Sequence, residues 1–127
     1  MNYGYKKQTP LPFSEAVLKT KTELAKEGFG ILTEIDVTAT LKKKLEVDYE
    51  NYVILGACNP PFAYQALQAE KEVGLLLPCN VIVYEDGGAT FVSAILPTVA
   101  MNAVGNTLLA DLAKEVEEKL KKAIDGI

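Results

Sequence analysis

Apolar and polar positions alternate with two different periods along the chain, and this pattern predicts a protein of mixed strands and helices. Apolar residues two positions apart are typical of strands, whereas apolar residues three and four positions apart are typical of helices. The strand pattern occurs in five segments, which are residues 1–8, 29–35, 52–58, 81–85 and 89–96. Asp86-Gly87-Gly88 separates the last two segments and is typical of a hairpin turn.

The helical pattern occurs in four segments, each with a start or stop signal. They run from Phe13 to the stop at Gly28, from Asp36 through Leu45, from Asn59 to about Glu70, and from Asn106 or Thr107 to the end of the chain. Asp36 and Asn59 are good N-cap residues, and Pro60 suits the first position of a helix. The order of elements predicts an α+β fold with two layers, a mainly antiparallel sheet of about five strands and packed helices. No linker or repeat interrupts this order, so residues 1–127 are expected to form a single domain.

The composition excludes several classes of function. Of the 127 residues 49% are hydrophobic, the net charge is −4, and the chain has no His, no Trp and no Arg. Without His there is no Ser-His-Asp triad, no Cys-His dyad and no His-containing metal site. Without Arg the bidentate contacts to guanine and phosphate are also missing. We therefore expect no nucleic-acid partner.

The chain also lacks the signals of secretion and membrane insertion. No apolar stretch follows Lys6 and Lys7, so no signal peptide is expected. No apolar run approaches the ~20 residues that a membrane span requires. The chain has enough apolar residues to form a hydrophobic core, and its only two cysteines suit a reducing compartment. The sequence therefore predicts a cytoplasmic protein without a membrane partner.

The dipeptide Cys-Asn occurs twice, at 58–59 and at 79–80, each time at the edge of a predicted strand. If those strands are antiparallel neighbours, the two thiols can face each other, and the helix that Asn59 opens would lower the pKa of Cys58. Three interpretations are open. The cysteines are small buried residues, or they form a reactive or disulfide-forming pair, or they capture a soft metal with help from carboxylates or a second copy.

Other candidate residues lie near these segments. Glu34 and Asp36 share one face of a strand, as paired catalytic carboxylates would, although a solvated strand end with Asp36 as a helix cap is the simpler interpretation. Tyr49, Tyr52 and Tyr64 bracket the Cys58 segment and are expected to line a pocket. The candidate site consists of Cys58, Asn59, Cys79, Asn80, Tyr64, Glu34 and Asp36. No catalytic residue, cofactor or metal is predicted.

Three segments carry a resemblance to a known family. They are EGFGILTEID at 27–36, ILGACNPP at 54–61 and GLLLPCNV at 74–81, and together they resemble the "domain of unknown function 302" family over essentially the whole chain. The resemblance implies a TATA-binding-protein-like β-α-β(4)-α fold, here with short helices inserted at 37–45 and 60–70. It also implies a homodimer. It implies no catalytic residues, because the family has no assigned biochemical role.

These observations lead to one functional hypothesis and two alternatives. The hypothesis is a non-catalytic, homodimeric protein that binds a small ligand or a partner near Cys58 and Cys79, with a sheet edge or an apolar helix face as the dimer contact. The first alternative is a thiol-dependent redox or detoxification protein that uses Cys58 and Cys79 as attacking and resolving sulfurs. The second alternative is a purely structural or regulatory interaction module.

Overall fold

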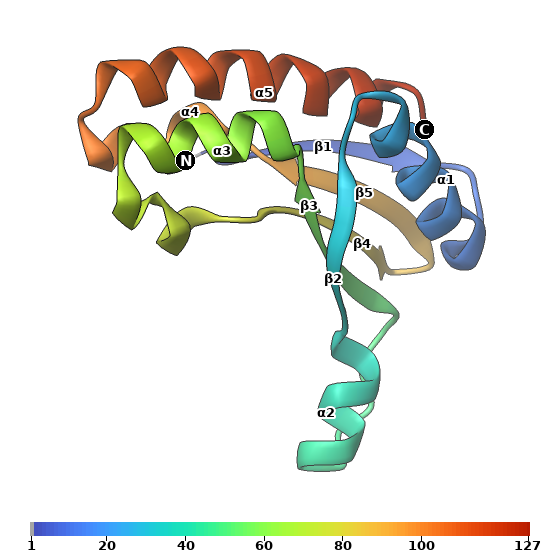
Figure 1. Ribbon diagram of the computed structural model, residues 1–127. Coiled ribbons are helices and arrows are strands. Elements are labelled where there is room, and N and C mark those ends of the chain that lie inside the picture. Colours follow the sequence, from blue (N-terminus) through green and yellow to red (C-terminus); the bar gives the residue numbers. More distant parts are fainter. Residues whose placement is uncertain (1) are drawn as a thin grey trace.

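The computed structural model describes residues 2–127 and contains a five-stranded sheet with helices packed on one of its faces (Figure 1). The elements, in chain order, are β1 (Gly4–Thr9), α1 (Phe13–Lys26), β2 (Gly30–Asp36), α2 (Val37–Leu45), β3 (Tyr52–Cys58), α3 (Pro60–Ala69), η1 (Lys71–Leu76), β4 (Cys79–Asp86), β5 (Ala89–Ile95), α4 (Pro97–Ala100), η2 (Asn102–Val104) and α5 (Thr107–Asp125). The predicted α+β class with an antiparallel sheet is therefore confirmed. The predicted first strand begins at Gly4, and Met1 lies outside the described residues.

The strands are arranged in the order β1-β5-β4-β3-β2, and every neighbouring pair is antiparallel. When α2, α3 and the short helices are set aside, the chain reads β-α-β(4)-α, as the resemblance implies. The hairpin at Asp86–Ala89 forms as predicted, because Gly87 and Gly88 adopt the positive φ angles that such a tight turn needs.

The main core lies between the sheet and helices α1 and α5. Alternate strand residues point to this inner face, and Leu55, Val81 and Val92 are fully buried there. From the helices, Leu24 of α1 and Leu120 of α5 complete the same core. The last predicted helix is present and buries one stripe of its surface, and Asn106 caps it by accepting bonds from the amides of Leu108 and Leu109.

The opposite face of the sheet, which we call the outer face, is not covered by any described helix (Figure 1). Two apolar rows of cross-strand neighbours lie on it, and the polar residues Ser93, Lys6 and Gln8 continue these rows toward β1. One row consists of Ile35, Ile54 and Ile82. The other row consists of Tyr52, Tyr84 and Phe91, whose neighbouring ring centroids are 5.4 Å apart in stacked pairs.

A second unusual feature is the connection between β2 and β3, which we call the arm (residues 37–51). It comprises α2 and an extended segment, and it projects away from the rest of the molecule (Figure 1). α2 contacts β2 and β3 only near its base and has no buried residue. Every residue from 42 to 51 is exposed. The arm therefore adds nothing to the core of a single copy.

Two segments differ from the sequence-based expectation. Residues 71–76 form a 3-10 helix, and Leu75 in the apolar run before Pro78 is 83% exposed. Residues 97–104 form two short helices, α4 and η2, where no element was expected. Within residues 2–127, no helix has the length and apolar character needed to cross a bilayer.

Candidate functional site

The two Cys-Asn segments lie side by side in the sheet. β3 and β4 are antiparallel neighbours, which is the condition under which the sequence brought the two segments together, and the end of β3 meets the start of β4. In this register Ala57 is the cross-strand partner of Cys79, and Gly56 is the partner of Asn80. Cys58 is therefore offset from Cys79 by one residue.

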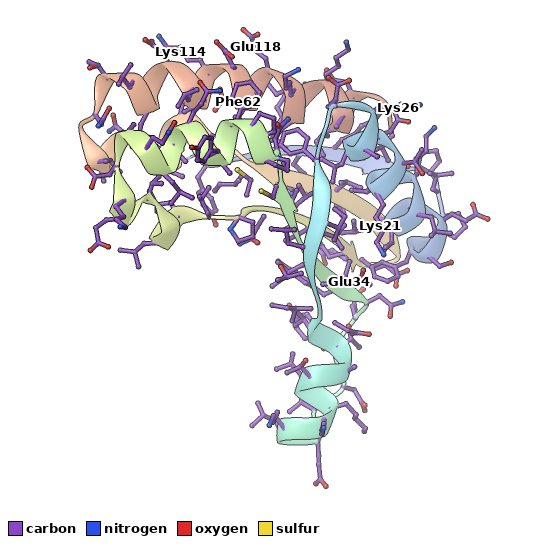
Figure 2. The ribbon with its side chains drawn as sticks, viewed as in Figure 1. Lys21, Lys26, Glu34, Phe62, Lys114 and Glu118 are labelled. Carbon is purple, nitrogen blue, oxygen red and sulfur yellow. The ribbon has the colours of Figure 1, made fainter. Side chains whose placement is uncertain are left out.

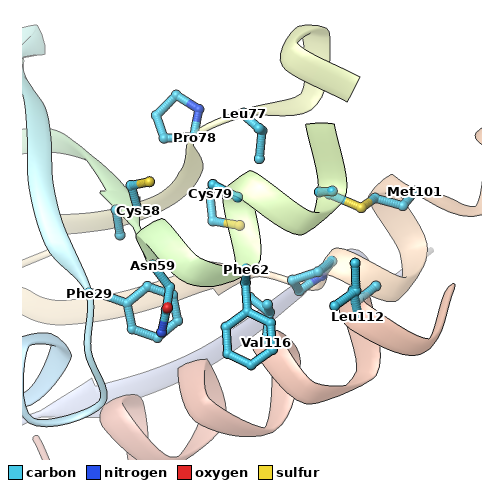
Figure 3. A pocket seen from close by; sticks show the side chains of 15 residues that line it. Phe29, Cys58, Asn59, Phe62, Leu77, Pro78, Cys79, Met101, Leu112 and Val116 are labelled. Carbon is cyan, nitrogen blue, oxygen red and sulfur yellow. The ribbon is translucent and has the colours of Figure 1, made fainter. Parts of the chain in front are cut away.

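This offset places the two thiols on opposite faces of the sheet. Side chains alternate between faces along a strand, so Cys79 shares the inner face with Ala57, whereas Cys58 projects to the outer face. In Figure 3 Cys58 lies on the side of Pro78 and Cys79 is directed toward α5, and both residues line the same cavity. Both cysteines are free. The expected face-to-face dithiol is therefore absent from this part of the described chain.

Cys79 is a buried core residue. Only 8% of it is exposed, and it packs within the core formed by the sheet, α1 and α5. Burial raises the pKa of its thiol to about 11, with a smaller contribution from the nearby Cys58. The thiol is therefore protonated at neutral pH, and a protonated thiol is a poor nucleophile and a poor metal ligand.

Asn59 occupies the N-cap position of α3, but its side chain does not cap the helix. Its amide Nδ2 instead donates to the carbonyl oxygen of Glu27 at 3.2 Å and so ties the start of α3 to the turn that follows α1. Pro60 and Pro61 have no amide hydrogen, so the first turn of α3 offers few free N–H groups to a thiolate or other anion. The predicted stabilisation of a Cys58 thiolate by this helix end has little structural support.

A cavity opens between α3, α5 and the start of β4 (Figure 3). Its apolar walls come from Phe29, Phe62, Cys79, Met101 and Val116, among others. The cavity volume is about 40 Å³. That volume accommodates roughly three water-sized groups. It can therefore hold a small apolar molecule or the apolar end of a larger one.

Cys58 and Asn59 also line this cavity, whereas the remaining candidate residues lie away from it. Tyr64 is 65% exposed on α3 and does not line the cavity, while Asn80 is exposed on the outer face. Glu34 and Asp36 share the inner face of the edge strand, as predicted. Glu34 forms an ion pair with Lys21 of α1 at 2.6 Å (Figure 2), and Asp36 caps α2 through the amide of Ala39. Both carboxylates therefore have structural roles.

The sequence analysis did not identify all of the residues that line the cavity. Leu112 and Val116 belong to the predicted stripe of α5, and Phe62 belongs to the predicted third helix. Met101 was missed because the apolar residues of segment 97–104 have neither the spacing of a helix nor that of a strand. Among residues 2–127, no group of three His, Cys, Asp or Glu side chains is placed to hold a metal ion.

The fold is an antiparallel sheet with helices on one face. Its order of elements defines a small α+β domain of the β-α-β(4)-α type. Comparison with protein families matches "Domain of unknown function DUF302" over residues 5–127, and the chain belongs to that family. A crystal structure of an uncharacterized conserved DUF302 protein from Bacillus stearothermophilus is similar, with a TM-score of 0.93 and 29% identity. The match covers 99% of this chain and 98% of that chain. No curated protein matches.

Proposed function

We propose that this protein is a non-catalytic binding protein of the cytoplasm, which acts as a homodimer of single-domain subunits (residues 1–127). Its ligand is a small apolar molecule or the apolar end of a larger one, held in the cavity beside Cys79. The observation that carries the proposal is the cavity itself, whose walls are apolar side chains from α3, α5 and the start of β4. Pockets between a sheet and its covering helices are common ligand sites.

The surroundings of the cavity favour binding over chemistry. Cys79 is protonated because burial raises its pKa to about 11, and Cys58, which also lines the cavity, belongs to the outer face in the register of β3. A disulfide requires Cα atoms about 4.4–6.8 Å apart and also Cβ atoms that point toward each other. The register, which assigns the two side chains to opposite faces of the sheet, argues against a redox pair within one copy.

The position of the cavity implies that a bound ligand stabilises the folded protein. Its wall joins Met101, which follows α4, to Leu112 of α5 and Phe62 of α3. A ligand there contacts both helices that cover this end of the sheet, so occupancy is expected to stabilise the folded state through mass action.

Xenon is a suitable probe of an apolar cavity of this size. We expect amide signals of cavity residues in NMR spectra to shift with xenon pressure. Ala63→Leu places a larger side chain in the cavity wall and is expected to abolish the shifts. Ala110→Leu, on the exposed side of α5, is the matched control and should preserve them. Equal xenon shifts in both variants, or no shift in the wild type, would contradict the proposal.

Native mass spectrometry of protein purified without reductant tests whether the protein retains a natural ligand. A dimer with additional mass that is lost on denaturation supports the proposal and gives the mass of the ligand. A bare dimer with reduced cysteines instead supports the structural or regulatory alternative.

A further inference from the structure

The outer face and the arm are two apolar surfaces that one copy of the chain leaves uncovered. Ile35 is 48% exposed in the isoleucine row of the outer face. In the arm, Leu45 and Val47 are 64% and 45% exposed. Apolar surfaces of this extent in a soluble protein mark interaction sites.

The arm has the sequence pattern of a covered element. From Leu45 to Glu50 apolar and acidic residues alternate strictly, which is the pattern of a half-buried extended segment. The segment nevertheless pairs with no strand among the described residues. α2 has nine residues, fewer than the roughly 12–15 below which an isolated helix is marginal in water. Both halves of the arm therefore need a surface that a single copy does not provide.

The charges of the arm are complementary to those at its own base. Lys42, Lys43 and Lys44 lie in the last turn of α2, at the tip, and Lys43 and Lys44 take part in none of the ion pairs of the described residues. At the base, four carboxylates surround the tyrosines that continue onto the outer face. They are Asp48, Glu50, Glu85 and Asp86, of which Asp48 already pairs with Lys42 of the same copy at 3.0 Å.

We propose that the outer face and the arm form the interface with a second copy of this chain, an inference that rests on the homodimer of the proposed function. In a two-fold dimer the same patch on each subunit must be self-complementary. Two antiparallel arms satisfy this requirement, because the lysine tip of each arm meets the carboxylates at the base of the other. The apolar residues Leu45 and Val47 then cover the isoleucine row of the partner's outer face.

The available area suits this arrangement. With strands about 4.8 Å apart and a rise of about 3.3 Å per residue, the outer face measures roughly 20 Å by 20 Å. Two such faces and two arms together offer on the order of 1,000 Å², which reaches the lower bound for a stable protein interface.

Charge reversal tests the interface without disturbing the core, because the residues changed are exposed or at the rim. One variant is Lys43→Glu with Lys44→Glu, and the other is Glu50→Lys with Asp86→Lys. The matched control, Lys71→Glu with Lys114→Glu, changes two exposed lysines elsewhere. Circular dichroism verifies folding, and sedimentation velocity measures the dimer dissociation constant.

We expect each reversal to raise the dissociation constant about tenfold or more, because like charges then face each other. An equimolar mixture of the two variants should form a heterodimer with nearly the affinity of the wild type, and the control should behave as the wild type does. A wild-type dimer that neither reversal weakens overturns this interface and leaves the proposed dimer standing. A wild-type monomer at every concentration overturns both. If that monomer binds phosphatidylcholine and phosphatidylserine vesicles through Lys43 and Lys44, the arm belongs to a lipid surface instead.

Discussion

Thr33 of β2 lies directly over Gly56 of β3 on the outer face of the sheet. The two residues are cross-strand partners beside an irregularity in the β2–β3 register, and a Cβ atom on Gly56 would collide with the hydroxyl of Thr33 and with the ring of Pro78. Gly56 is therefore required by a close approach of side chains from both neighbouring segments. The contact fixes the position of Pro78 immediately before Cys79.

Gly56→Ala is expected to reduce the free energy of unfolding by ~1–3 kcal/mol, because the added methyl group has no room. Urea unfolding measures the change. Thr33→Ala combined with Gly56→Ala should recover part of the loss, since one of the two obstructions is then removed. Gly30→Ala is the control, because a Cβ atom there meets no other atom within 4 Å. An equal loss in the Gly30 variant would contradict this explanation.

Burial of Cys79 predicts an alkaline loss of stability. Its pKa is raised from 9.0 to about 11, so between these values the unfolded chain releases the proton while the folded chain retains it. The contribution of the buried neutral thiol is therefore complete below pH 9 and is lost as the pH rises toward 11, by roughly 2–3 kcal/mol at most.

The measurement is the difference in unfolding free energy between the wild type and Cys79→Ala. This difference should shrink between pH 9 and 11, whereas the corresponding difference for Val81→Ala, a buried apolar neighbour, should stay constant. Parallel behaviour of the two variants would show that the Cys79 thiol does not carry the effect.

The two cysteines should differ in their reaction with iodoacetamide. Cys58 is partly exposed on the outer face, whereas Cys79 is buried and, with a pKa of about 11, has about 0.1% thiolate at pH 8. We expect Cys58 to be alkylated first and Cys79 to react only after unfolding or local opening. Peptide mass spectrometry at successive times identifies the order. Faster alkylation of Cys79 than of Cys58 would require a different position for β4.

Asn106 should contribute more to stability than the other asparagine in the same connection. Its side chain accepts bonds from the amides of Leu108 and Leu109 at 2.9 and 3.2 Å, so Asn106→Ala is expected to cost about 1 kcal/mol. Asn102→Ala is the matched change, since Asn102 is exposed and makes no hydrogen bond through its side chain among those of the described residues. Thermal unfolding should separate the two variants by several degrees.

Removal of the arm should leave the fold intact. α2 has no buried residue and residues 42–51 are all exposed, so replacing residues 38–50 by a short glycine-containing turn between β2 and β3 removes no buried side chain, although it removes the hydrogen bond from the Tyr52 amide to Thr38. At concentrations where the protein is monomeric, we expect the free energy of unfolding to change by less than about 1 kcal/mol. Far-UV circular dichroism and urea unfolding measure this. A collapse of the sheet would show that the arm supports its own subunit.

Local chemistry made most of the fold predictable from the sequence. The β-branched run at Tyr52–Cys58, the glycine turn after Asp86 and the stripe of α5 each specify one element, and all three are present. The segment after Pro97 was not predictable, because α4 and η2 are single turns held by packing against α5. No periodicity develops within three or four residues.

The candidate site was predictable only in part, because the sequence does not specify how neighbouring strands are aligned. The sequence placed Cys58 and Cys79 at the ends of two strands and left open whether these strands are neighbours, and it could not specify the register. A shift of one residue moves a side chain to the other face, and Ala57 rather than Cys58 pairs with Cys79. That shift assigns the thiols to opposite faces of the sheet, so Cys79 is a core residue and Cys58 is a partly exposed one.

The row of rings on the outer face also gives this protein an intrinsic optical signal. The chain has six tyrosines and no tryptophan, so its ultraviolet fluorescence comes from tyrosine. Tyr49, Tyr52 and Tyr84 lie close together, with ring centroids 6.3 and 5.4 Å apart along the row. Half of the emitting groups therefore report on a single surface, and contact with any second molecule there becomes visible in unlabelled, unmodified protein.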